Sequence, residues 1–193
     1  MMSYNFEEKP LLIFWETTKA CGLKCEHCRA SAILDALPDE MDYLKNNEIP
    51  FSVSPAVTDL LNDEAILSFK KYGVSAVSIS LDGMKETHEK IRGVSGVFEN
   101  TISVINKLIK NNITMQVNTV VMKSTVHDLP DVLKVLLDGN VKVWEVFFLI
   151  RTGRGIDKED LTPEEYEDVN KWLLYISGYG LRIRTVESPI YRR

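Results

Sequence analysis

The chain has 193 residues, of which 45% are hydrophobic and 26% charged, and its formal net charge is −5 at pH 7. This length and composition are typical of one globular domain and exclude extensive disorder or a coiled coil, while the acidic balance argues against a nucleic-acid partner. No apolar run reaches the roughly 18 residues that a membrane helix needs, and the first ten residues lack the pattern of a signal peptide. We therefore expect a cytoplasmic protein without a membrane partner.

The hydrophobic pattern predicts strands and helices that alternate along the chain. The first strand, LLIFW at residues 11–15, is a continuous apolar run, as expected of a strand that is covered on both faces. Asn62 and Gly73 have the residue types of a helix N-cap and a helix stop, and residues 162–165 (TPEE) form a capping box. In chain order, the predicted elements are strand 11–15, a weaker strand 51–53, helix 62–72, strand 75–80, helix 97–110, strand 114–121, helix 129–137, strand 141–150, a helix from 163 to about 177, and strand 181–185.

Strands that alternate with helices at this spacing predict right-handed crossovers and a mainly parallel sheet, which makes the fold α/β. Periodicity does not distinguish an open, doubly wound sheet from a barrel or part of one. In either case, reactive groups are expected at the carboxyl ends of the strands. The cysteines follow the first predicted strand closely, so we expect them at that position.

Cys21, Cys25 and Cys28 are the only cysteines, and they lie together in CGLKCEHC. An odd, clustered set in a chain of this kind does not indicate a disulfide framework. Three thiolates on one loop can bind one metal centre and leave one coordination position open. The centre is then either zinc, with His27 as fourth ligand, or an iron–sulfur cluster with one iron open to substrate. Adjacent residues in a tight loop rarely point at the same metal, which disfavours zinc, and a reduced, unligated set is a third reading.

The CGLKCEHC segment resembles the C-x3-C-x2-C loop of radical S-adenosylmethionine (SAM) enzymes. The preceding LLIFWETTKAC, Arg29, and the later SISLDG, IRG and FFLIRTGRG resemble the branch that carries a C-terminal SPASM extension and modifies peptides or tetrapyrroles. The resemblance implies that the three cysteines hold a [4Fe–4S] cluster whose fourth iron binds SAM. One electron, from a donor such as a flavodoxin or ferredoxin, would cleave SAM to a 5′-deoxyadenosyl radical that abstracts hydrogen from the substrate. The implied fold is a partial (β/α) barrel of mainly parallel strands.

The resemblance also implies cofactor-binding residues beyond the cysteines. His27 lies in the segment that would contact the adenine. Ser80 and Asp82, at the end of a predicted strand, suit the ribose or the amino group of SAM, although Asp-Gly is also a common turn pair. Asn118 is a polar residue in the middle of a strand and needs a partner, and SAM is the partner that the family implies. Leu149 would flank the adenine, although an apolar strand residue is more often plain core.

Other polar residues have less specific roles. Arg92 in IRG can bind a carboxylate or simply cap its loop. Arg151 and Arg154 in RTGRG can meet an acidic substrate, although exposed arginines are usually solvated. His88 and His127 are expected at the surface or in loops.

The sequence departs from the family pattern in two places. The family has a Gly-Gly motif after its second strand that holds the SAM amino group, whereas this chain has no Gly-Gly and no glycine between Gly22 and Gly73. Only 22 residues separate Cys28 from Phe51, whereas a helix, a strand and a second helix need on the order of 40. We therefore expect that about one helix–strand unit is missing after the cysteine loop.

The C-terminus is the second departure, because the chain ends without the cysteine-rich extension of this branch. Residues 1–193 are thus predicted to form a single, incomplete radical SAM domain with no SPASM domain. Two alternatives follow from the same residues. One is a catalytically impaired remnant that still binds a cluster, and the other is a small zinc-binding module.

Overall fold

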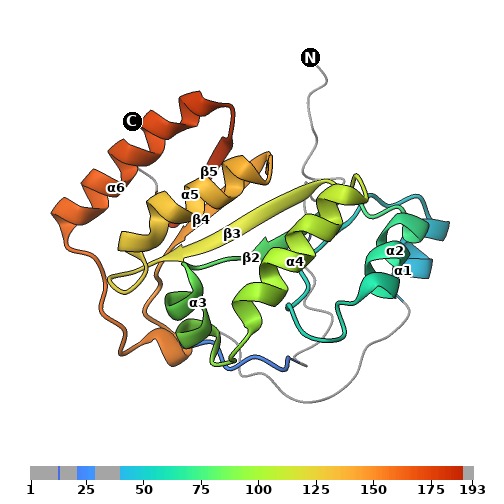
Figure 1. The fold of residues 1–193 in the computed structure, drawn as a ribbon, viewed down its shortest axis with the longest axis horizontal. Coiled ribbons are helices and arrows are strands. Elements are labelled where there is room, and N and C mark those ends of the chain that lie inside the picture. Colours follow the sequence, from blue (N-terminus) through green and yellow to red (C-terminus); the bar gives the residue numbers. More distant parts are fainter. Residues whose placement is uncertain (1–12, 14–20, 29–39, 189–193) are drawn as a thin grey trace, which may run out of the picture.

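The computed structural model describes residue 13, residues 21–28 and residues 40–188. The predicted strand at 11–15, except for Ile13, and Arg29 lie outside the described residues. The described part contains one sheet of five parallel strands in the order β1-β2-β3-β4-β5 (Figure 1). The strands are β1 (Ser52–Val53), β2 (Ala76–Ser80), β3 (Met115–Val121), β4 (Val143–Phe148) and β5 (Arg182–Val186).

Helices connect these strands, as a parallel sheet requires. They are α1 (Glu40–Asn46), α2 (Asp63–Tyr72), α3 (Lys85–Arg92), α4 (Val97–Lys110), α5 (Leu129–Asp138) and α6 (Pro163–Ile176), with short 3₁₀ helices η1 (Val126–Asp128), η2 (Gly153–Gly155) and η3 (Ser177–Tyr179). The predicted α/β fold with a mainly parallel sheet is confirmed. Between Cys28 and β1, the described residues contain one helix, α1.

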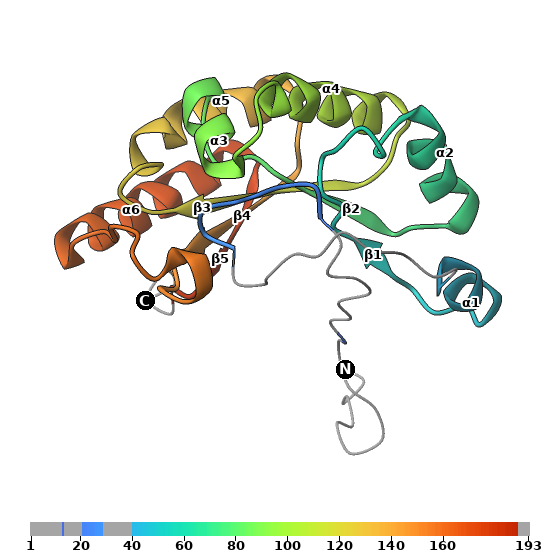
Figure 2. The same ribbon diagram turned by 90° about the horizontal axis from the view of Figure 1, so that it is seen from below.

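The helices α2, α4 and α5 lie side by side over one side of the sheet (Figure 2). In β3, residues alternate strictly between buried and half-buried, and the buried ones, such as Val117, belong to the main core together with Val77 and Trp144. Because side chains alternate between the two faces of a strand, the half-buried residues lie on the opposite face. Among the described residues, no helix covers that second face, which we call the uncovered face.

Local sequence signals account for the helix ends. The Asn62 side chain accepts a hydrogen bond from the Ala65 backbone N–H at 3.0 Å, and Gly73 ends α2 in the left-handed region with φ 72°. At the start of α6, Thr162 and Glu165 form both hydrogen bonds of a capping box. These caps satisfy backbone groups that have no partner inside the helix, and both predictions are confirmed.

One helix, α3, was not among the predicted elements. Its sequence KETHEKIR is mostly polar, and the helix buries only His88 and Ile91. The prediction that His88 lies at the surface or in a loop is wrong, because His88 is in the middle of a helix and 1% exposed. His127 does lie at the surface, in the short 3₁₀ helix η1, where it is exposed.

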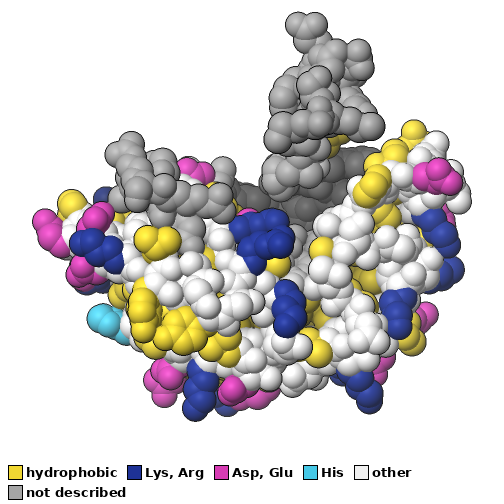
Figure 3. All heavy atoms as spheres, turned by 90° about the horizontal axis from the view of Figure 1, so that it is seen from above, with side chains coloured by type: hydrophobic (Ala, Val, Ile, Leu, Met, Phe, Trp, Pro, Cys, Tyr) yellow, Lys and Arg dark blue, Asp and Glu magenta, His cyan; other side chains and the backbone are white. Residues whose placement is uncertain are grey.

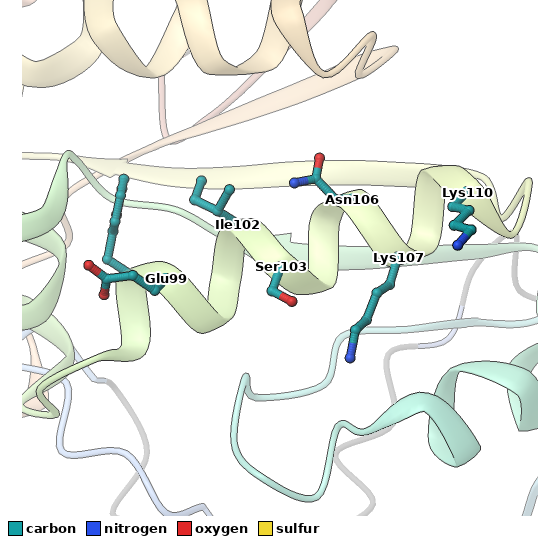
Figure 4. Close-up of a pocket in the computed structure, with 7 residues that line it drawn as sticks. Glu99, Ile102, Ser103, Asn106, Lys107 and Lys110 are labelled. Carbon is teal, nitrogen blue, oxygen red and sulfur yellow. The ribbon is translucent and has the colours of Figure 1, made fainter.

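The described outer surface gives little specific indication of a binding site. Basic and acidic side chains are interspersed around the face that Figure 3 shows. A shallow hollow of about 500 Å³ follows α4 (Figure 4), but Lys107 and Glu99 in its lining are already paired with Asp63 and Lys85. In the described ranges, no helix is long and apolar enough to span a membrane.

Candidate metal and cofactor site

The cysteine loop, residues 21–28, is fixed against the C-terminal end of α3 (Figure 1). The Lys24 N–H donates to the carbonyl of Arg92 at 3.1 Å, and the Glu26 N–H donates to the carbonyl of Ile91 at 2.8 Å. Carbonyls in the last turn of a helix have no partner within the helix. The loop therefore satisfies the end of α3, and α3 in turn positions the loop near the carboxyl end of β2.

The other side of the loop contacts the segment after β4. The Arg154 N–H donates to the carbonyl of Cys28 at 3.2 Å, and Lys158 pairs with Glu26 at 2.7 Å. A Cβ atom on Gly155 would lie 3.6 Å from the Cα of His27, so the backbones pack closely here. The motifs IRG and RTGRG, far apart in the sequence, thus hold the two sides of one loop.

Gly93 has a specific role in this packing. Its φ of 69° is in the left-handed region, which favours glycine. A Cβ atom on Gly93 would lie 3.2 Å from the Cβ and 3.3 Å from the carbonyl oxygen of Lys24. Glycine therefore ends α3 and also allows the cysteine loop to approach.

The three cysteines share one small apolar cluster. Cys25 is 8% exposed and packs with Leu23 and Val97, and Cys21 and Cys28 pack against this cluster from half-buried positions. In the part of the chain that the structure describes, no three His, Cys, Asp or Glu side chains are arranged around a single metal ion. The cysteines of an iron–sulfur cluster bind different irons and so lie farther apart than the ligands of one ion.

A buried ion pair lies directly behind Cys25. The Asp82 carboxylate is fully buried, and its Oδ2 forms an ion pair with the Arg92 guanidinium at 2.5 Å. A second nitrogen of the same guanidinium donates to Cys25 Sγ at 3.5 Å. The other oxygen of Asp82 accepts the backbone N–H of Val120 at 3.1 Å. Arg92 therefore connects the end of β2 to the cysteine loop.

His88 completes this buried group. Its Nδ1 accepts the backbone N–H of Asp82 at 3.1 Å, so the ring proton is on Nε2, which lies 3.3 Å from Thr101 Oγ1 and donates to it. Burial is the main cause that lowers the pKa of His88 to about 4. The ring is therefore neutral near pH 7.

Burial and charge act in opposite directions on the neighbouring groups. Burial would raise the pKa of Asp82, but Arg92 and the nearby imidazoles together hold this pKa below its usual value. Burial would lower the pKa of Arg92, but Asp82 and Cys25 raise it, so the pair is charged. Burial raises the pKa of the Cys25 thiol and lowers that of His27.

The residues beside the loop fit a polar cofactor. His27 Nδ1 and Arg92 Nε are buried and have no hydrogen-bond partner among the described residues. Buried polar atoms are normally paired, so a polar group that reaches the loop would satisfy them. Three thiols on the same loop are also the donor type that iron–sulfur clusters use.

The other predicted site residues fall into two places. Leu149 follows β4, is 7% exposed and packs with Ile91 and Met122, near the cysteine loop. Ser80 and Asn118 are opposite each other in the register of β2 and β3, and both are half-buried on the uncovered face. Asp82 does not join them, because its carboxylate is buried against Arg92.

The uncovered face has a polar row that the sequence reading did not identify as a site. Gln116 donates to both Asn118 Oδ1 and Glu145 Oε2 at 2.7 Å. Glu145 is opposite Asn118 in the register and also opposite Arg184 on β5. Strict alternation in strand 114–121 was the available signal for Gln116, and the spacing of Met84, His88 and Ile91 was the signal for the buried face of α3.

A model of the radical SAM superfamily matches residues 33–136, which is more than half of the chain. The chain belongs to the radical SAM superfamily. This superfamily uses a [4Fe–4S] cluster and SAM, so membership implies both cofactors for this radical SAM chain. The matched segment begins after the cysteine loop, so the family assignment is independent of the three cysteines.

Two relatives from Methanosarcina barkeri resemble this radical SAM chain over most of its length. An AdoMet-dependent heme synthase is 28% identical over 222 residues, which cover 95% of this chain and 64% of the relative. An Fe-coproporphyrin III synthase is 24% identical over 233 residues, with coverages of 97% and 58%. The chain thus spans about three fifths of the length of these relatives.

The first of these alignments is longer than the chain itself. Its 222 residues exceed the 193 residues of the chain by 29, so the heme synthase has at least 29 aligned positions without a counterpart here.

A solved structure shows the same fold. Streptococcus suis SuiB bound to the precursor peptide SuiA superposes with a TM-score of 0.66 and 13% identity, covering 88% of this chain and 47% of SuiB. The structural neighbours are radical SAM partial barrels, which confirms the predicted partial (β/α) barrel.

Proposed function

We propose that Cys21, Cys25 and Cys28 bind a [4Fe–4S] cluster and that SAM binds at its open iron. The cofactors would supply reductive cleavage of SAM to methionine and a 5′-deoxyadenosyl radical, which abstracts hydrogen from the substrate. The observation that carries the proposal is the placement of three thiols on one loop, which α3 and η2 hold at the carboxyl ends of parallel strands. Strand ends of this kind hold the active sites of (β/α) barrels.

The chain's own residues would bind and orient SAM. His27 lies on the loop with an unpaired buried nitrogen and would contact the adenine, which Leu149 would flank. Ser80 and Asn118 on the uncovered face would hydrogen-bond the ribose or the amino group. Asp82 would act on the site through Arg92, since its carboxylate is already paired.

We further propose a tetrapyrrole rather than a peptide as substrate. Both relatives described above are named as synthases of tetrapyrroles, and Arg182 and Arg184 are exposed on the uncovered face. Arginine pairs strongly with carboxylates, and the propionates of a tetrapyrrole are carboxylates. SuiB, which is bound to a precursor peptide, supports a peptide as the second candidate. A flavodoxin or ferredoxin would supply the electron.

Anaerobic reconstitution with iron and sulfide tests the cluster. We expect about four iron atoms per chain and an EPR signal on reduction with dithionite. The matched control is a variant in which all three cysteines are serine. Iron content no higher than in this control would contradict the proposal, and zinc without iron in protein purified anaerobically would favour the zinc-binding module instead.

The catalytically impaired remnant is a second candidate, and the absent Gly-Gly segment supports it. Loss of one charged interaction with SAM costs about 1.5–3 kcal/mol, or more than tenfold in affinity. Addition of SAM and dithionite to the loaded chain separates the two candidates. Formation of 5′-deoxyadenosine supports the enzyme, whereas a reducible cluster without this product supports the remnant.

A further inference from the structure

Arg92 has two contacts that point in different directions. One guanidinium nitrogen lies 2.5 Å from Asp82 Oδ2, and another lies 3.5 Å from Cys25 Sγ. The Arg92 side chain is only 12% exposed, and the Asp82 side chain is fully buried. A planar guanidinium presents several donors in a fixed geometry, so pairing with Asp82 fixes which donor faces the sulfur.

We propose that Arg92 is a positioning residue for the cluster: held by Asp82, it donates a hydrogen bond to the Cys25 sulfur and raises the reduction potential of the cluster bound there. This inference rests on the proposed function, because it requires Cys25 to be a ligand. A reduced cluster carries one more negative charge than an oxidised one. Hydrogen bonds and positive charge near a ligand sulfur therefore favour the reduced form.

Asp82 limits the rise in reduction potential that Arg92 causes. Its carboxylate compensates the Arg92 charge at short range, so the cluster receives an oriented donor with little net charge behind it. The two residues should therefore shift the potential in opposite directions when they are changed. Removal of the donor lowers the potential, whereas removal of the compensating carboxylate leaves an unopposed positive charge and raises it. A purely structural ion pair predicts no such opposition.

The test is an EPR-monitored redox titration of the reconstituted chain without SAM. For Arg92→Met, we expect about a tenfold lower ratio of reduced to oxidised cluster at a fixed potential, which is about 59 mV for a one-electron couple. For Asp82→Asn, we expect a shift in the opposite direction. Lys90→Met is the matched control, because Lys90 is an exposed cation on the same helix, and we expect no shift.

Folding of each variant is checked by circular dichroism. If Arg92→Met does not fold, Arg92→Lys is titrated, because one ammonium cannot contact both Asp82 and Cys25. Its potential should then be below that of the wild type. Two results would overturn this inference but not the proposed function. One is an Arg92 variant with the same reduction potential as the Lys90 control, and the other is a shift of potential in the same direction for the Arg92 and Asp82 variants. A wild-type chain that takes up no cluster overturns the proposed function and the inference with it.

Discussion

Single residues around α3 carry most of the buried polarity of the site. His88 accepts a backbone N–H with Nδ1 and donates with Nε2, so protonation at Nδ1 would place two N–H groups against each other. Burial opposes the charge as well, and the pKa of His88 is about 4. The folded state therefore binds a proton less readily than the unfolded state, whose histidine has a pKa of about 6.5.

This difference predicts a stability that depends on pH. Between pH 6.5 and 4, the unfolded state binds more protons than the folded state. The free energy that neutral, buried His88 contributes to folding is therefore fully present above pH 6.5 and is lost as the pH falls toward 4. The loss from His88 reaches about 3 kcal/mol. Urea unfolding at several pH values measures it. Protonation of Asp82, whose pKa is also lowered, adds a further loss only below about pH 4.

Two histidine variants assign the effect. His88→Gln keeps a neutral polar side chain and should flatten the pH dependence between 6.5 and 4. His127→Gln changes the exposed histidine of η1 and should leave the dependence unchanged. An equal slope for His88→Gln and the wild type would contradict the assignment.

At the scale of elements, the C-terminal end of α3 positions the cysteine loop. Gly93 and Gly73 both end a helix in the left-handed region, but only Gly93 touches the loop. Substitution of either by alanine costs about 1–2 kcal/mol for the backbone conformation. Gly93→Ala also brings a methyl group to 3.2 Å from Lys24, so we expect it to weaken cluster retention.

Gly73→Ala is the matched control, because nothing lies within 4 Å of its added Cβ. Both variants should lose similar unfolding free energy in urea. Only Gly93→Ala should lose iron faster on gel filtration after reconstitution. Equal iron retention in the two variants would show that the close approach to Lys24 does not position the cysteines.

The same elements show how far the sequence could predict the fold. Helix caps such as Asn62 and Thr162 are local, so the sequence predicted α2 and α6 with their ends. The strands β2 to β5 are recognisable from apolar and β-branched runs. The helix α3 has only a weak local signal, the spacing of His88 and Ile91 in a mostly polar sequence, and His88 is buried there by packing against Phe98 of α4.

For the candidate site, the sequence predicted the cysteines and Asp82 as site residues but did not indicate the partner of Asp82. The pairing with Arg92 joins positions ten residues apart across a turn and a helix, and the contact to Cys25 joins positions 67 residues apart. Such contacts depend on the tertiary fold. Residue types alone allowed Arg92 either to bind a carboxylate or to cap its loop, and the structure shows it paired with the carboxylate of Asp82.

At the scale of the whole molecule, the uncovered face of the sheet presents a row of polar side chains. Ser80, Asn118, Glu145 and Arg184 lie at one level across four strands. Residues at one level of a parallel sheet share a face and lie side by side. With Ser80 and Asn118 proposed to bind SAM, a flat ligand with charged edges can contact β4 and β5 beside them, which agrees with the proposed tetrapyrrole substrate.

This arrangement predicts that Arg184 contributes to substrate binding. If its guanidinium pairs with a propionate, Arg184→Gln should weaken the binding of coproporphyrin about three- to tenfold, because charge-assisted hydrogen bonds contribute about 1 kcal/mol or more when partly exposed. Absorbance titration of the porphyrin band measures the dissociation constant. Lys134→Gln removes the same charge from the exposed side of α5 and serves as the control. Equal weakening by both variants would indicate attraction by overall charge and would contradict a specific role of Arg184 in binding the propionate.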